Sequence, residues 1–218
     1  MKKIISEVSQ NISESLNKMV YSEDLEPDKK VSNLISIDWR NVLPEPPKNN
    51  SEVTRQELME LSKLTKNRTQ EQLELVMAVD KKVDDIFIEY LEKANLSFPQ
   101  KIVDKLYNTI FYPIFMNLKW QYNRPRPYQL GPLLGIEIDY IETKTHHTPA
   151  YPSGHTAYGA MLASFLSEIY PSHSSNFYNL ANVVGLARKL QGVHYESDNS
   201  SAMVIAGAIW EDVRFDFI

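Results

Sequence analysis

Three residues near the C-terminal end of the chain have the types and spacing needed for chemistry at a histidine. Arg188 lies six positions before His194, and Asp198 lies four positions after it. A carboxylate four residues away on a helix or tight turn can hold one ring nitrogen, which leaves the other in a fixed tautomer as a base or nucleophile. Arg188 adds a permanent charge suited to an oxyanion. Taken alone, the trio is better explained by structural roles, with Arg188 near a helix C-terminus and Asp198 as a helix cap.

Two further groups carry residue types that bind anions. Lys119 and Arg126 lie at the end of one predicted helix and in the loop after it, and Ser153, Gly154 and His155 lie at the start of another. A helix start offers unpaired backbone N–H groups to an anion, and glycine lets the backbone approach closely. An N-cap for Ser153 and a hydrogen-bonded helix position for His155 explain each residue singly. Only the combination indicates a site.

Together these segments resemble the three-part motif of the superfamily of type-2 phosphatidic-acid phosphatases and vanadium haloperoxidases. That motif reads Lys-x6-Arg-Pro, then Pro-Ser-Gly-His, then Ser-Arg-x5-His-x3-Asp. The matching positions, in chain order, are Lys119, Arg126, Pro127, Pro152, Ser153, Gly154, His155, Arg188, His194 and Asp198.

The match departs from the motif at Ala187, where the family usually has serine. This change concerns helix packing or a supporting contact rather than a phosphate ligand. Arg124-Pro125 falls outside the motif because Asn117 would occupy the lysine position, so Arg124 receives no role. The resemblance spans about 80 residues. Gly-Val-His-Tyr-Glu-Ser-Asp-Asn at 192–199 and Leu-Pro-Glu-Pro-Pro at 43–47 look most like bacterial class A non-specific acid phosphatases.

The resemblance implies a metal-independent phosphatase that hydrolyses phosphomonoesters through a phosphohistidine. His194 would be the nucleophile, Asp198 would orient it, and His155 would protonate the leaving group and then activate water. The residues expected to bind the phosphate are Lys119, Arg126, Ser153, Gly154 and Arg188. Such cations and N–H donors suit a phosphoryl group in transfer, whose charge spreads over three oxygens. No cofactor is expected, and vanadate would act as an inhibitor.

Three alternative interpretations compete with the phosphatase. A vanadate-dependent haloperoxidase would use the same anion pocket with vanadate as its prosthetic group, although such enzymes are usually much longer. A lipid phosphatase would need membrane-spanning helices, which the segment with Lys81, Lys82, Asp84 and Asp85 cannot provide. A catalytically silent helical interaction module is disfavoured because every motif position that would contact phosphate or protons is filled.

Other polar and aromatic residues carry weaker signals. His146-His147 is the only adjacent histidine pair, but no nearby carboxylate completes a familiar metal-ligand spacing, so no metal site is predicted. Trp120, Tyr122 and Tyr128 flank the first motif. They could line a substrate pocket, and packing in the core or at the rim is at least as good an interpretation.

Composition limits the class of protein. The net charge of −5 argues against a general nucleic-acid surface, and the absence of cysteine excludes disulfides and thiolate metal sites. The uncharged stretch 145–167 is interrupted by Pro149, Pro152 and Gly154, so it is not a membrane span. The basic N-terminus lacks an apolar run, so no signal peptide is predicted. We expect a soluble, cytoplasmic protein that binds a small-molecule phosphate ester. The sequence leaves its oligomeric state open, with a homo-oligomer as one option.

The hydrophobic periodicity predicts an all-α, single-domain helical bundle with the active site at helix ends in the bundle core. Helices are expected over 3–20, 54–66, 69–91, 97–122, 154–169, 175–190 and 198–214, the second and third opened by capping boxes at Thr54–Glu57 and Thr69–Gln72. Ile136–Ile141 is the only candidate strand. Residues 1–53 are expected to form an N-terminal helix and a proline-containing strap packed on a catalytic bundle, 54–218.

Overall fold

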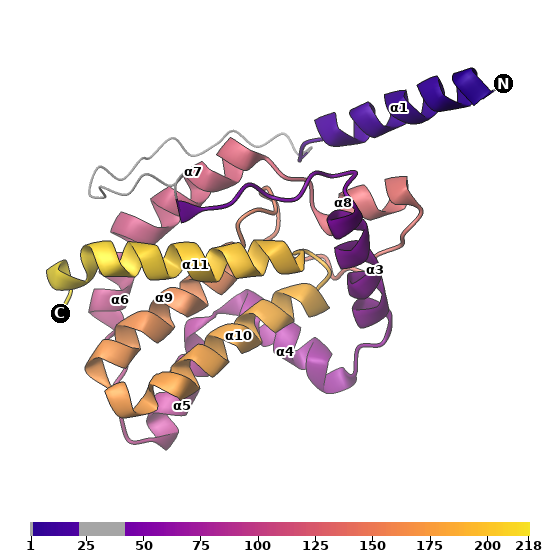
Figure 1. Cartoon of the computed structure of the whole chain (residues 1–218). Helices are drawn as coiled ribbons and strands as arrows, with labels where there is room; N and C mark the ends of the chain where they lie inside the picture. The colour runs from indigo at the N-terminus through magenta and orange to yellow at the C-terminus, as the bar shows by residue number, and fades with distance from the viewer. Residues whose placement is uncertain (1, 22–41) are drawn as a thin grey trace.

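The computed structural model describes residues 2–21 and 42–218 of the chain (Figure 1), and those residues form an all-α bundle, as predicted. No strand occurs in these two ranges, and the candidate strand Ile136–Ile141 is irregular. The helices are α1 (Lys2–Lys18), α3 (Glu52–Lys66), α4 (Gln70–Lys81), α5 (Asp84–Lys93), α6 (Gln100–Leu106), α7 (Tyr112–Tyr122), α8 (Pro127–Leu130), α9 (Gly154–Ile169), α10 (Ser174–Leu190) and α11 (Glu196–Val213).

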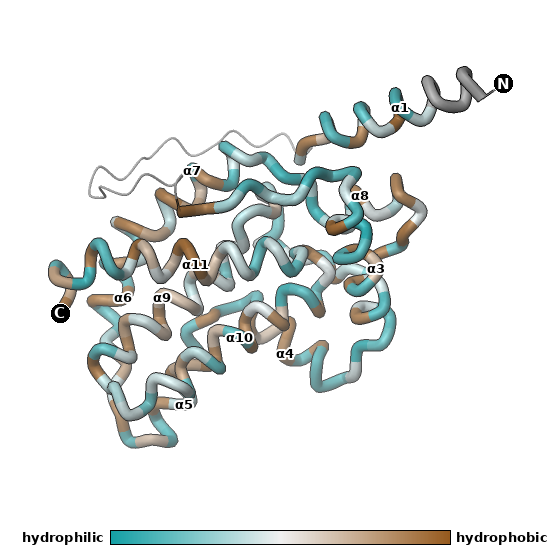
Figure 2. The backbone as a smooth tube through the Cα atoms, in the orientation of Figure 1, coloured by the Kyte–Doolittle hydropathy of each residue, from teal (hydrophilic) through white to brown (hydrophobic). Residues whose placement is uncertain are grey.

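Helix α9 is the centre of the bundle, packed against α10 and α11 (Figure 1). Gly159 allows the close approach of α10, because a Cβ there would lie 3.2 Å from Val184 Cγ2. On the other side, Phe165 meets Trp210 of α11 edge to face, with ring centroids 5.6 Å apart. Figure 2 shows hydrophobic segments recurring along α7 and α11. This packing fixes the N-terminal end of α9, where Ser153, Gly154 and His155 lie.

The helix predicted over 69–91 is two helices, and this part of the prediction was wrong. Its capping box at Thr69 and Gln72 is confirmed, but α4 ends at Lys81 and Lys82 is extended. Asp80, in the last turn of α4, accepts hydrogen bonds from Arg188 and Thr143, far along the chain. The helix break therefore directs a carboxylate to the motif arginine, a tertiary contact that periodicity does not reveal.

The capping box predicted at Thr54 and Glu57 is also wrong, although the helix itself is confirmed. The N-cap is Ser51, whose hydroxyl accepts from the Thr54 N–H at 3.2 Å. The helix therefore begins two residues before the predicted start. This shift leaves the Glu57 carboxylate away from the helix end, and it points instead toward the start of α11, where it accepts from Ser197 N.

Helices α6 and α7 form the predicted continuous segment, joined by a π-helical stretch, η1 (Tyr107–Phe111). The Tyr112 N–H bonds to the Tyr107 carbonyl, five residues back. Pro113 follows directly. It has no N–H for a helical bond to the Thr109 carbonyl, and its ring would clash there in an α-helix. The wider turn accommodates the proline without ending the helix.

The strap packed on the bundle stays a prediction, because residues 22–41 lie outside the described ones. Residues 44–48 are non-helical, as expected from their prolines. Asn49 then donates to the carbonyls of Leu16 and Met19, both at 2.9 Å, and so joins this segment to the C-terminal end of α1. Among the described helices, none is both long and apolar enough to cross a membrane.

Candidate active site

His194 is held at both ring nitrogens in one tautomer. Its Nδ1 lies 3.0 Å from Asp198 Oδ2, and its Nε2 lies 2.8 Å from Arg126 Nη1. A guanidinium can only donate, so Nε2 is the acceptor and Nδ1 carries the proton given to Asp198. Burial, followed by the charges of Arg126 and Lys119, lowers the pKa of His194 well below its usual value. The ring is therefore neutral, with its Nε2 lone pair directed at the cationic side of the site.

Arg124 and Glu57, to which the sequence analysis gave no part in the site, support Asp198 on the side away from His194. We call Glu57, Arg124 and Asp198 the Arg124 cluster. Arg124 Nη1 donates to Asp198 Oδ1 at 2.6 Å, and Nη2 donates to Glu57 Oε2 at 3.2 Å. The guanidinium also lies over the Tyr195 ring, 3.8 Å from its centroid. Burial alone would lower the pKa of Arg124, but Asp198 and the other nearby anionic groups raise it overall. Arg124 therefore fixes the carboxylate that orients His194.

The three predicted phosphate-binding cations are buried and held by oxygen atoms of the protein. Lys119 Nζ donates to the Pro149 carbonyl at 2.6 Å, and Arg126 Nε donates to the Thr148 carbonyl at 2.8 Å. Arg188 Nη1 donates to Asp80 Oδ1 at 2.6 Å. All three have 5% or less of their surface exposed.

Burial disfavours the charge on each of these cations. It lowers the pKa of Lys119 well below its ordinary value, with Arg126 adding to the effect. It also lowers the pKa of Arg126 to about 10, together with Arg188. Burial lowers the pKa of Arg188 too, against the opposing effect of Asp80. An anion brought among these side chains would relieve the mutual repulsion, so the arrangement favours binding a multiply charged oxyanion.

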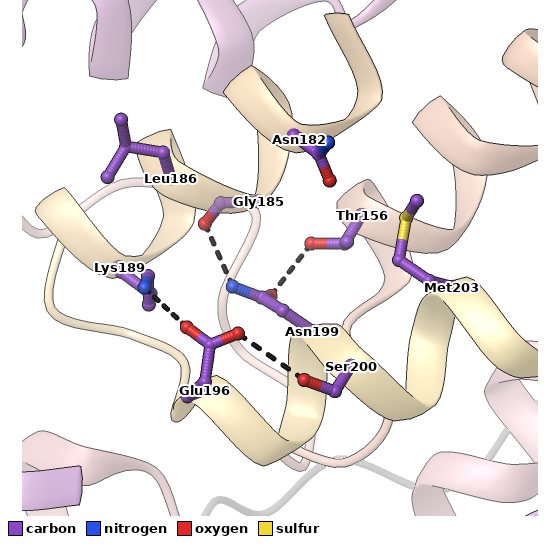
Figure 3. A pocket seen from close by; sticks show the side chains of 9 residues that line it. All are labelled: Thr156, Asn182, Gly185, Leu186, Lys189, Glu196, Asn199, Ser200 and Met203. Carbon is purple, nitrogen blue, oxygen red and sulfur yellow. Dashed lines mark hydrogen bonds and ion pairs between the residues drawn. The ribbon is translucent and has the colours of Figure 1, made fainter. Parts of the chain in front are cut away.

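Ser153 is fully buried, and its hydroxyl belongs to a chain of hydrogen bonds that leads away from the cations. Ser153 Oγ lies 2.8 Å from Thr156 Oγ1, which donates to Asn199 Oδ1 at 2.8 Å, and Asn199 Nδ2 donates to the Gly185 carbonyl. The bonds from Thr156 to Asn199 and from Asn199 to Gly185 lie beside a pocket of about 290 Å³ (Figure 3). Because the Thr156 proton goes to Asn199, Thr156 accepts from Ser153. The Ser153 hydroxyl proton is therefore engaged by Thr156, and the hydroxyl would have to rotate to donate to any other acceptor.

Gly154 and His155 face a larger cavity of about 620 Å³, which Lys119 and Thr148 also line. A Cβ on Gly154 would lie 3.6 Å from Lys119 Cε, so the helix start and the lysine are adjacent. Burial, followed by the charges of Arg188 and Lys119, lowers the pKa of His155 well below its usual value, while Asp80 raises it. The charges of Lys119, Arg126 and Arg188 act on both His155 and His194, so these five side chains lie near one another at helix ends. Their roles in a site stay a prediction.

The weaker candidates lie outside this cavity. His146 is buried, stacks on His147 with centroids 4.8 Å apart, and meets Tyr128 edge to face. In the part of the chain that the structure describes, no three metal-type side chains gather. Tyr122 packs on Tyr151 and Trp120 on Tyr21. The three aromatic residues flanking the first motif therefore serve packing rather than line the cavity.

The sequence profile of the PAP2 superfamily matches residues 103–211, half of the chain. That range contains every motif residue of the site and excludes Asp80 and Glu57. A solved structure, the first transmembrane PAP2-type phosphatidylglycerolphosphate phosphatase from Bacillus subtilis, aligns with a TM-score of 0.49 and 18% identity. The alignment covers 77% of this chain and 88% of that one.

Curated relatives match over shorter stretches. An acid phosphatase of Zymomonas mobilis is 35% identical over 57 residues, which are 26% of this chain and 22% of the relative. A non-specific acid phosphatase of Providencia stuartii is 36% identical over 69 residues, 31% of this chain and 28% of the relative. One from Salmonella typhimurium is 43% identical over 49 residues, 22% of this chain and 20% of the relative. The matched stretches thus span less than a third of each relative.

Proposed function

Because the chain belongs to the PAP2 superfamily, we propose that it is a phosphatase that hydrolyses phosphomonoesters through a phosphohistidine at His194. The observation that carries the proposal is the position of His194 Nε2. Asp198 holds the opposite ring nitrogen at 3.0 Å, and the cations Arg126 and Lys119 lower the pKa of the ring. A neutral, oriented imidazole beside an anion site is suited to attack phosphorus.

In the first step, the Nε2 lone pair attacks the phosphorus atom while the bond from phosphorus to the ester oxygen breaks. Arg126 Nη1 now donates to Nε2, so it must move to an equatorial phosphate oxygen as the substrate enters. His155, in its protonated form, gives its proton to the departing alkoxide. Lys119, Arg126 and Arg188 would stabilise the charge on the equatorial oxygens, with the N–H groups at the start of α9.

In the second step, water replaces the alcohol. His155, now neutral, takes a proton from the water, whose oxygen attacks the phosphorus as the N–P bond breaks. Inorganic phosphate leaves and His194 returns to its neutral form. Asp198 stabilises the positive charge that the phosphorylated ring carries, and Arg124 keeps that carboxylate in place. We propose no metal ion for either step, because Lys119, Arg126 and Arg188 would supply the positive charge around the phosphate.

A phosphate-release assay over sugar phosphates, nucleotides and aryl phosphates tests the proposal. We expect release in EDTA and competitive inhibition by vanadate, which resembles the five-coordinate transition state and should bind far more tightly than substrate. Activity lost in EDTA and restored by a divalent ion would contradict the metal-independent mechanism. Oxidation of bromide or chloride with vanadate and peroxide, in the absence of phosphate release, would instead identify a haloperoxidase.

A further inference from the structure

The cavity of about 620 Å³ is much larger than a phosphate group needs, and cavities of roughly 300–1,000 Å³ typically enclose whole small molecules. Lys119, Gly154 and His155 of the proposed site are among its lining residues. The rest of its wall includes side chains of η1 and α7, among them Tyr107, Tyr112 and Met116. If phosphate occupies the cationic end, the alcohol part of the ester must lie along this second wall.

The direction of the alcohol follows from the position of His155. A general acid must lie within hydrogen-bond reach of the leaving oxygen, so the alcohol begins beside this ring. Tyr158 is three residues further along α9 and therefore on the same face of the helix. Its ring packs against Tyr107 of η1 with centroids 4.7 Å apart, and Tyr107 packs against Tyr112 at 5.8 Å. The leaving group thus passes from His155 onto an aromatic surface made by α9 and η1.

The π-helical turn gives this surface its shape. Both Tyr107 and Phe111, the first and last residues of η1, line the cavity. A π turn inserts an extra residue and changes which side chains face inward, and such turns occur frequently at functional sites. Pro113 explains why the backbone forms a π turn here, and the result of that turn is that Tyr107 and Phe111 both line the cavity.

The charges near the aromatic surface oppose a second anionic group. The stretch 107–116 contains no lysine or arginine. Asp84 and Asp104 line the same part of the cavity, and Asp84 accepts a hydrogen bond from the Tyr158 hydroxyl. Lys81 and Lys82 line the cavity at the junction of α4 and α5. Lys82 Nζ lies 3.4 Å from Asp85 Oδ1 and 3.9 Å from Asp84 Oδ2, so these two carboxylates balance the charge of Lys82.

We infer that the cavity selects phosphate esters whose alcohol is largely apolar and carries no anionic group, an inference that rests on the proposed phosphatase function. Apolar area removed from water on binding favours such an alcohol. A carboxylate or a second phosphate in the same place would lose hydration beside Asp84 and Asp104, with no cation on η1 to replace it.

Two substrates with the same leaving oxygen test the inference. 3-Phenylpropyl phosphate and 3-carboxypropyl phosphate are both esters of primary alcohols, so the chemical step is closely matched and only the distal group differs. We expect kcat/KM to be at least about tenfold higher for the phenyl compound, from burial and ring packing together. Equal values, or a preference for the carboxylate, would overturn the inference. No phosphate release from any ester would overturn the proposed function itself.

Decyl phosphate, at a concentration where it is monomeric, distinguishes two kinds of apolar alcohol, an alkyl chain and an aromatic ring. Faster turnover than with the phenyl compound identifies a chain-type alcohol and slower turnover a ring-type one, and both results agree with an apolar wall. A kcat/KM for decyl phosphate no higher than that of the carboxylate would contradict the inference.

Two matched tyrosine variants locate the effect. Tyr112 and Tyr178 are each 40% exposed, but only Tyr112 lines the cavity. Tyr112→Ala should raise the KM for the phenyl substrate, and so reduce the ratio of kcat/KM between the phenyl and carboxylate substrates about three- to tenfold. Tyr178→Ala should leave this ratio unchanged. Met116→Lys should raise kcat/KM for the carboxylate substrate by placing a cation on the wall. An unchanged preference in both cavity variants would show that the alcohol does not lie there.

Discussion

Two buried arginines each hold a carboxylate next to the proposed histidine pair, at the same Nη1–Oδ1 distance of 2.6 Å. Arg124 and Asp198 lie behind His194, where neither lines the cavity and Asp198 is fully buried. Arg188 is bonded to Asp80, which does line the cavity. The first pair is therefore a permanent support, whereas the second faces the place where a phosphate would arrive.

The electrostatic surroundings of the two arginines reinforce this difference. Burial lowers the pKa of Arg124, but Asp198 and Glu57 raise it overall, so two carboxylates stabilise its positive charge. Burial lowers the pKa of Arg188 despite Asp80. A phosphate could add negative charge beside Arg188 and partly replace Asp80, but none is needed beside Arg124. Under the proposed function, similar ion pairs would thus serve positioning in one case and substrate binding in the other.

The largest expected effect is on stability, from Arg124→Met. This change leaves Asp198 and Glu57 buried without their cation, and breaking one partner of a buried ion pair costs about 3–5 kcal/mol. Urea unfolding followed by circular dichroism measures the loss. Arg214→Met is the control, since Arg214 pairs with Glu168 at the surface and such pairs contribute at most about 1 kcal/mol. Similar losses for the two variants would contradict the support role of Arg124.

Arg188→Met should reduce activity strongly and stability less than Arg124→Met does. Losing one charge-stabilising group lowers kcat about 10²- to 10³-fold, or about 2.7–4 kcal/mol of barrier. Its effect on unfolding should be smaller than that of Arg124→Met, because water in the cavity can hydrate Asp80. Steady-state rates with p-nitrophenyl phosphate and urea unfolding on the same preparation measure both. A stability loss as large as that of Arg124→Met would erase the distinction between the pairs.

Asp80→Asn should strengthen anion binding. The carboxylate competes with phosphate for Arg188, and its removal takes a like charge from the site while leaving Thr143 and Thr145 in place. We expect the inhibition constant for inorganic phosphate to fall about tenfold, equivalent to about 1.4 kcal/mol. Glu57→Gln, a change in the Arg124 cluster, is the control and should leave that constant unchanged. Weaker phosphate binding in Asp80→Asn would mean that the carboxylate positions Arg188 rather than competing for it.

The smallest effect concerns pH. His155 must carry a proton to act as the acid, so kcat/KM should fall as pH rises through its pKa in the free enzyme. Burial and Arg188 lower that pKa, which places this limb below 6.5, the ordinary histidine value. Asp80 raises the pKa. Asp80→Asn should therefore move the limb to lower pH, and Glu57→Gln should not. A limb above 6.5 in the wild-type protein, or no movement in Asp80→Asn, would contradict the assignment.

The same two pairs show how much of the site the sequence could predict. Spacing within a motif predicts local geometry, and the His194–Asp198 contact agrees with it, whereas the roles of the motif residues in a site stay a prediction. The partners Asp80 and Glu57 were missed, since each is an ordinary carboxylate on a helix, 108 and 140 residues from the groups it contacts. Arg124 was set aside because it does not fit the motif, although it lies only two residues before Arg126.

The fold followed a similar pattern. Periodicity predicted the all-α class and most helices, because one apolar stripe per helix reports burial directly. It missed the break at Lys82 and the π turn at Tyr107–Phe111. Both interruptions lie in the wall of the cavity, where tertiary contacts outweigh local preference. Pro113 was the available signal for the second, and nothing in the local sequence signalled the first.

The central claim is that His194, held by Asp198 and the Arg124 cluster, becomes phosphorylated. Rapid acid-free quenching with ³²P-labelled p-nitrophenyl phosphate, followed by peptide mapping, tests it most directly. We predict an acid-labile, alkali-stable label on His194, present in wild type and in His155→Ala, where a good leaving group needs no proton, and absent in His194→Ala. A label on another residue, or full turnover by His194→Ala, would contradict the claim.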